Sequence, residues 1–160
     1  MTKLTLIAAV ALLAAAAPAH AAGTVQVSFI QPERFSDVRD AYLSSTRNLE
    51  ALKQHLEAAA ARYLNASQKL SIDVLDVNLA GKTEMTRTAM GLRVLRGRAD
   101  WPRIELRYTL ESAGSAARSG QATVSDMAYL QHGSTSRFSG EALHYERRML
   151  DAWFRAEFSR

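Results

Sequence analysis

Cysteine is missing from this 160-residue chain. Without it, no disulfide can hold a small fold together, no thiol can serve as a nucleophile, and no lipid can be attached to a cysteine behind a cleaved leader. The fold must therefore be stabilised by its hydrophobic core alone.

The short motifs of familiar enzymes are missing as well. There is no Gly-x-Ser-x-Gly or His-Glu-x-x-His segment, and His55, His132 and His144 lie on separate predicted segments without metal-ligand spacing. An active site needs a base and a group that orients it, and the sequence places neither. We therefore expect no cofactor, and the sequence does not indicate an enzyme.

A long apolar run is present at the N-terminus. Residues 4–17 are apolar, Lys3 precedes them, and Ala-His-Ala at residues 19–21 matches a small-x-small cleavage site. The run is too short to span a bilayer core of about 30 Å. We read residues 1–21 as a signal peptide cleaved after about Ala21. The mature chain is then expected to be a soluble periplasmic protein of bacteria without a transmembrane segment.

Charge is nearly balanced. The chain has 20 Lys and Arg against 16 Asp and Glu, and loss of Lys3 with the leader would leave 19 basic residues. This mild excess is mostly arginine, and an exported protein does not meet genomic nucleic acid, so nucleic acid is not an expected partner. Residues 22–160 are enough for one domain with a real core and too few for two.

The clearest strand covers residues 101–110. Its apolar side chains, Ile104, Leu106, Tyr108 and Leu110, alternate with the polar side chains Arg103, Glu105, Arg107 and Thr109. This period of two is typical of a half-buried antiparallel strand, which we place in the middle of a sheet. A turn at residues 112–114 leads to a weaker partner at residues 118–124, whose composition suits an edge strand or a strand that faces solvent on one side.

Three further strands are predicted. Residues 24–30 alternate cleanly, and a further strand is predicted at residues 92–96. Residues 70–79 change phase, because Leu70, Ile72 and Val74 share one side whereas residues 75, 77 and 79 share the other. Such a change indicates either a β-bulge or a strand covered on both faces.

Two long helices complete the pattern. Residues 46–64 and 141–158 carry apolar side chains three and four residues apart, which is the spacing of one helix stripe. We therefore predict a single α+β domain over residues 22–160. Its mostly antiparallel or mixed sheet has four to five strands, with the two main helices packed on one face.

Several segments together resemble a known family. They are FIQPERF at residues 29–35, His55, ARYL at 61–64, VLDVNLAG at 74–81, WPRIELRY at 101–108, SDM at 125–127 with Tyr129 and Leu130, Tyr145-Glu146, and MLD at 149–151 with Trp153 and Phe154. The chain thereby resembles the uncharacterised exported bacterial proteins of domain of unknown function 3016. The resemblance implies a single exported domain, and it supplies no activity, cofactor or partner that could be transferred to this chain.

Arginine supplies the most distinctive surface feature. Arg87, Arg93, Arg96 and Arg98 follow one another without an intervening acidic residue, and Arg103 and Arg107 continue them on the polar side of the predicted strand. Guanidinium groups suit phosphates and carboxylates. These six arginines are the candidate binding residues, for anionic lipid head groups or an acidic envelope protein. The alternative is an ordinary solvated surface neutralised by neighbouring acids.

Two carboxylates are the candidate metal ligands. If a bulge turned Asp76 toward Asp126, the pair could bind a hard cation through oxygen, although calcium takes six or more such ligands. The leading hypothesis is therefore a non-enzymatic periplasmic binding or interaction module. The alternative is a small envelope hydrolase or metal-binding enzyme that uses Asp76 and Asp126.

Overall fold

The computed structural model describes residues 23–39, 45–85, 90–132 and 143–159 of the chain. The elements are β1 Thr24–Phe29, η1 Pro32–Arg34, α1 Ser45–Ala61, β2 Gln68–Asn78, β3 Lys82–Met85, β4 Met90–Val94, η2 Gly97–Ala99, β5 Arg103–Ser112, β6 Arg118–Ser125 and α2 His144–Phe158. The predicted α+β class is confirmed. The predicted signal peptide and Arg87 lie outside the described residues.

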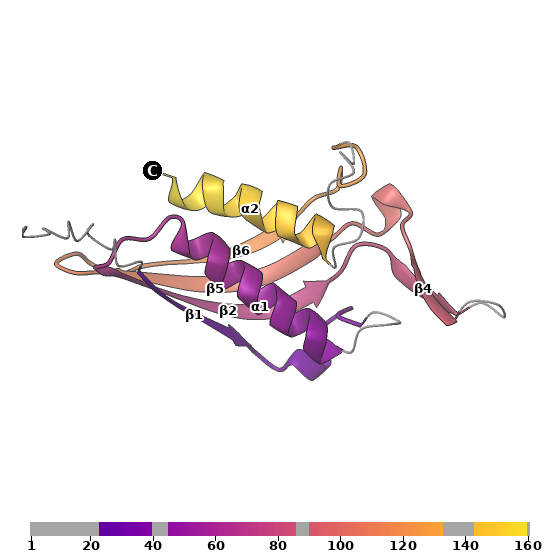
Figure 1. Cartoon of the computed structure of the whole chain (residues 1–160), viewed down its shortest axis with the longest axis horizontal. Helices are drawn as coiled ribbons and strands as arrows, with labels where there is room; N and C mark the ends of the chain where they lie inside the picture. The colour runs from indigo at the N-terminus through magenta and orange to yellow at the C-terminus, as the bar shows by residue number, and fades with distance from the viewer. Residues whose placement is uncertain (1–22, 40–44, 86–89, 133–142, 160) are drawn as a thin grey trace, which may run out of the picture.

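Four strands form the main sheet, in the order β1-β2-β5-β6 (Figure 1). The β1–β2 pair is parallel, whereas the β2–β5 and β5–β6 pairs are antiparallel. Helix α1 lies between β1 and β2 in the chain and makes the crossover that a parallel pair requires. As predicted, β5 lies inside the sheet and β6 lies at its edge.

Both helices lie across the same face of this sheet (Figure 1). The alternation predicted for β5 is confirmed, because Ile104, Leu106 and Tyr108 are buried on the helix side, whereas Arg107 is exposed on the other. The sheet contributes Val27, Leu70, Ile72, Val74, Val77, Ile104, Leu106, Tyr108 and Val124 to the core; α1 contributes Leu52, Leu56, Ala59 and Ala60, and α2 contributes Met149, Leu150 and Phe154. Each large apolar side chain buried here stabilises the fold by roughly 1.5–3 kcal/mol.

The phase change in β2 is a β-bulge. The register with β5 shifts between Val74 and Asp76, so that Leu75 is the extra residue. Val74 and Val77 therefore both face the core. Beside the bulge, the chain leaves the sheet after Ile30 and returns at Asp37, whose N–H donates to the Val77 carbonyl at 2.9 Å. The bulge thus sets where β2 presents its polar side chains.

Strands β3 and β4 form a separate two-stranded sheet at one end of the main sheet (Figure 1). The strand predicted at residues 92–96 corresponds to β4, whereas β3 was not predicted. None of the helices in the described ranges is long and apolar enough to cross a membrane.

Candidate functional site

Polar side chains cover the sheet face that lies opposite the helices. The charged ones on the two central strands are Lys69, Asp73, Asp76, Arg103, Glu105, Arg107 and Glu111. Asp73 and Arg107 are direct partners in the β2–β5 register, and the guanidinium of Arg107 donates to the Asp73 carboxylate at 2.7 Å. Arg107 is therefore neutralised by its neighbour across the sheet.

Arg93 is held inside the protein rather than on a binding surface. Its two terminal nitrogens lie 3.2 and 3.1 Å from the two carboxylate oxygens of Asp37, and they also donate to the carbonyls of Gly81 and Arg39. Its side chain is 13% exposed. Arg93 thus ties the β3–β4 sheet to the segment before α1.

The remaining predicted arginines lie apart from this contact. Arg96 and Arg98 are exposed at η2, where the N–H of Arg96 donates to Asp100 at 2.7 Å. Arg103 and Arg107 lie on the outer face of β5. Of the five candidate arginines that the structure describes, Arg93 is therefore bound inside the protein, whereas the other four have exposed or partly exposed side chains at η2 and on β5.

Arg103 has hydrogen-bonding capacity that its neighbours leave unused. Its Nη2 lies 3.7 Å from Asp76 and its Nε lies 3.9 Å from Glu105, and both distances exceed hydrogen-bond range. The Nε is buried without a hydrogen-bond partner, although the side chain as a whole is 42% exposed. A guanidinium carries five N–H donors in a planar fork, so Arg103 can still bind an acceptor.

A hollow of about 310 Å³ lies beside Arg103. Its walls come from the loop before α1, the end of β2, the start of β3 and the segment before β5; the lining residues are Ser36, Asn78, Lys82, Ala99, Asp100, Trp101 and Arg103. The Nζ of Lys82 lies 3.1 Å from Asn78 Oδ1 and 3.5 Å from Asp37 Oδ2. Two cationic side chains therefore border one hollow.

The acidic residues at this hollow are already bound. Both Asp100 oxygens accept hydrogen bonds at 2.7 Å, one from the Tyr129 hydroxyl and one from the Arg96 N–H. Burial, followed by the bond to Asp100, raises the pKa of Tyr129 to about 12, so the phenol stays protonated and keeps donating. Asp76 likewise accepts from the N–H and the hydroxyl of Ser36, at 2.6 and 2.7 Å.

The two candidate metal ligands lie on different sides of the sheet. Asp76 belongs to the outer-face group with Ser36 and Arg103, whereas Asp126 follows β6 and accepts from Arg148 of α2 at 3.0 Å. Strand β5 separates them, which corresponds to two strand spacings of about 4.8 Å each. Among the described residues, no group of three or more His, Cys, Asp or Glu side chains could hold a metal ion. A metal role for either carboxylate stays a prediction.

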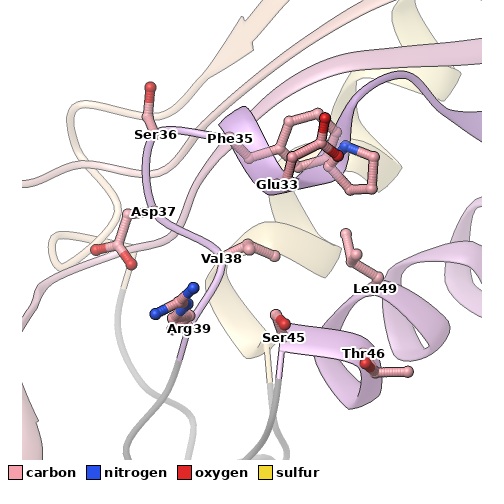
Figure 2. Close-up of a pocket in the computed structure, with 10 residues that line it drawn as sticks. Glu33, Phe35, Ser36, Asp37, Val38, Arg39, Ser45, Thr46 and Leu49 are labelled. Carbon is pink, nitrogen blue, oxygen red and sulfur yellow. The ribbon is translucent and has the colours of Figure 1, made fainter.

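A larger hollow, of about 510 Å³, lies between residues 32–39 and the start of α1 (Figure 2). Val38 and Leu49 line its apolar part, while the side chains of Ser36 and Asp37 are directed away from them (Figure 2). Asp37 instead faces Arg93 and Lys82. The polar groups of this segment therefore do not converge inside this hollow.

The sequence analysis named Arg103 and the nearby Asp76 as candidates but did not name Lys82. Lys82 is the first residue of β3, where no periodicity marks it, and Trp101 is marked in the sequence only as the start of the predicted strand at residues 101–110. The sequence feature that could have indicated this site is the phase change in β2, because the bulge places Asp76 and Asn78 together on the polar side at the end of the strand.

The comparisons agree with the resemblance seen in the sequence. No curated protein and no solved structure matches the chain significantly. The sequence model of one protein family, "Protein of unknown function (DUF3016)", matches residues 23–156 of the chain. The matched range includes all the strands that the structure describes and nearly all of α2. The chain therefore belongs to the DUF3016 family of proteins of unknown function.

Proposed function

We propose that this chain is a non-enzymatic binding module that takes a phosphate or carboxylate group of its partner into the hollow beside Arg103. The observation that carries the proposal is the unused donor capacity of Arg103: its nearest acids are 3.7 and 3.9 Å away, and its Nε is buried without a partner. The exposed part of the guanidinium can still donate charge-assisted hydrogen bonds to a bound anion.

The chemistry of the hollow favours an anion over a cation or a neutral group. Arg103 offers a planar fork that fits the paired oxygens of a phosphate or carboxylate, and Lys82 adds a second positive charge. The carboxylates of Asp76 and Asp100 are engaged by other donors. Asp76 and Glu105 nevertheless reduce the local positive potential, so we expect selectivity to depend on the geometry of the fork rather than on net charge.

We further propose that the module works in the bacterial periplasm. The support is the sequence of residues 1–21, in which a basic start, an apolar run and Ala-His-Ala follow one another. Expression of the full chain in a Gram-negative bacterium should yield a periplasmic protein whose N-terminal residue is Ala22. Recovery of the uncleaved chain from the cytosol would contradict this location.

Binding is tested by titrating the purified protein with inorganic phosphate and with acetate, followed by two-dimensional NMR of backbone amides and arginine side chains. We expect shifts at Asn78, Lys82 and Arg103. Arg103→Gln should weaken the response at least about tenfold, because it removes the charged fork. Arg107→Gln is the matched control, because it lies on the same face of β5 but is already bound to Asp73.

Two results would contradict the proposed function. One is a wild-type protein whose amides do not respond to either anion. The other is an equal loss of response in Arg103→Gln and Arg107→Gln, since that would indicate a general effect of surface charge.

A further inference from the structure

Strand β6 has one row of backbone groups that no described strand pairs with. It is the last strand in the sheet order, and β5 is its neighbour on one side (Figure 1). The N–H of Asp126 donates to the Pro102 carbonyl at 3.3 Å, and the register with β5 continues from there without a shift. Hydrogen-bonded pairs alternate along an antiparallel ladder, so every second residue of β6 directs its N–H and C=O away from β5. These residues are Ser119, Gln121, Thr123 and Ser125.

This edge lacks the features that normally block further strand pairing. Natural edge strands are often very short, bent by a bulge, or interrupted by proline and lysine. Strand β6 is eight residues long, contains neither proline nor lysine, and keeps an unshifted register with β5. Its one charged residue is Arg118, at the first position. The edge is therefore a regular backbone template for another extended chain.

The chemistry of the edge favours a strand, and its side chains favour a strand of the same protein. A row of N–H and C=O groups pairs with another extended backbone, whereas the backbone groups of a helix are already bonded internally. Proteins that add a foreign peptide as a strand select it with pockets for alternate side chains. The residues from Ser119 to Ser125 carry mostly short side chains, which offer little to select a foreign peptide. A symmetric dimer needs no such pockets, because each copy supplies the matching strand.

We propose that the protein forms a symmetric dimer in which the β6 strands of two copies pair antiparallel, with Ala122 at the twofold axis. This register uses all the outward-directed backbone groups, because it pairs Ser119 with Ser125 of the second copy and Gln121 with Thr123 of the second copy. The two main sheets become one continuous sheet. The dimer forms at the edge of the sheet, so it does not rest on the proposed anion binding beside Arg103.

Charge supports this arrangement of the two strands. The register places Arg118 opposite Asp126 of the second copy, and opposite charges across a strand pair are favourable. A parallel arrangement in register would instead place Arg118 beside Arg118, which is unfavourable. Arg118 and Asp126 also have partners within their own chain, Glu157 at 3.6 Å and Arg148 at 3.0 Å. We therefore expect the new pair to fix the register more than it raises the affinity.

Sedimentation equilibrium over a range of protein concentrations tests the dimer. We expect the wild type to dimerise. Thr123→Pro removes an outward-directed N–H but no bond to β5, so it should weaken the dimer at least about tenfold. Thr123→Ala is the matched control, because it shortens the same side chain but keeps the N–H, and the dissociation constant should stay within about twofold. Thermal melting of each variant checks that it is folded.

The absence of cysteine allows a direct test of the register. In the proposed dimer the two residues at position 122 form a non-hydrogen-bonded pair with Cα atoms about 4.5 Å apart, which a disulfide can bridge. Ala122→Cys should therefore yield a covalent dimer under mild oxidation. Ser119→Cys is the control, because it is more exposed on the same strand but three residues from the axis. Its two copies would be about 20 Å apart, too far for a disulfide.

Three results would overturn the proposal. The first is a wild type that sediments as a monomer at every concentration, which would leave the edge to a strand of another protein. The second is a dimer that Thr123→Pro and Thr123→Ala leave equally strong. The third is crosslinking of Ser119→Cys as readily as Ala122→Cys, since the two copies would then meet in another register or through another surface.

Discussion

The backbone of Gly120 lies directly against the ring of Tyr108, its partner across the β5–β6 register. A Cβ at residue 120 would be 2.7 Å from both the Cζ and the hydroxyl oxygen of Tyr108. The ring is held in place by Trp153 and Phe158 of α2, with ring centroids 5.8 and 5.4 Å away, and its hydroxyl donates to Glu157. Tyr108 therefore cannot withdraw without losing these contacts.

Gly120→Ala should consequently destabilise the protein. Overpacking of this kind costs about 1–3 kcal/mol, and urea denaturation should show that loss in the free energy of unfolding. Gln121→Ala is the control, because Gln121 is the exposed neighbour on the same strand, and we expect it to change the stability by less than about 0.5 kcal/mol. Equal effects of the two substitutions would show that the Tyr108 ring moves freely.

Arg93 should behave as a structural residue. Its guanidinium meets both oxygens of Asp37, and the two side chains are 13% and 16% exposed. Arg93→Ala leaves Asp37 poorly solvated, and among the described residues Lys82, at 3.5 Å, is then its one remaining cation partner. We expect a loss of about 3 kcal/mol in the free energy of unfolding, measured by urea denaturation.

Arg98→Ala is the comparison that separates structural from surface arginines. Arg98 comes from the same predicted group but is exposed at η2, so its removal should change the stability by less than about 0.5 kcal/mol. If Arg98→Ala destabilised the protein as much as Arg93→Ala, the contact with Asp37 would not be the cause.

The main sheet was predictable from the sequence because its signals are local. In β5, Ile104 and Leu106 alternate with Glu105 and Arg107, and one face is buried, so the period of two survives in the structure. The phase change at Leu75 likewise required either a bulge or two covered faces, and the bulge is observed. Strand β3 carried no such signal, because Lys82 to Met85 belong to a two-stranded sheet apart from the main one.

The candidate site was less predictable, because a sequence shows which residues are charged but not which residues each of them contacts in the fold. Arg93 and Arg103 are ten residues apart and look alike, yet the Arg93 side chain pairs with Asp37, 56 residues away, whereas the Arg103 side chain makes no hydrogen bond to a described residue. The order of the strands decides these pairings. Lys82 lines the same hollow as Arg103 from the first residue of β3, where neither spacing nor hydrophobicity marks it.

His55 links the two helices and should make their packing sensitive to acid. Its Nε2 lies 3.1 Å from the Arg147 carbonyl and 3.1 Å from Asp151 Oδ1. Burial lowers the pKa of His55 below 6.5, while Asp151 partly opposes that change. The unfolded chain thus takes up a proton more readily, so stability should fall as the pH drops below 6.5 toward the lowered pKa.

His55→Gln removes this titration while keeping a side-chain N–H donor. In urea denaturation between pH 7.5 and 5, the wild type should lose stability relative to His55→Gln as the pH falls. Asp151→Asn should enlarge the loss of unfolding free energy at low pH, because it removes the carboxylate that raises the pKa of His55. Parallel pH profiles for the wild type and His55→Gln would disprove the linkage.

Glu146 should make the stability depend on pH in the opposite direction. It is 3% exposed in the first turn of α2, and its Oε1 accepts the Ala80 N–H at 2.7 Å. Burial raises the pKa of Glu146 above 4.5, partly opposed by the Ala80 N–H and the positive charge of Arg93. The folded chain holds this proton more tightly than the unfolded chain, so stability should fall as the pH rises from 4.5 through the raised pKa.

Glu146→Gln keeps an oxygen for the Ala80 N–H but cannot ionise. The stability of this variant relative to the wild type should therefore increase with pH across the window and level off above it, as measured by urea denaturation from pH 4.5 to 8. Glu146→Ala removes the acceptor itself and leaves the buried N–H of Ala80 unpaired, so it should be less stable than Glu146→Gln at every pH, by about 1–3 kcal/mol. A pH-independent difference between Glu146→Gln and the wild type would mean that the carboxyl has the same pKa in the folded and unfolded chains.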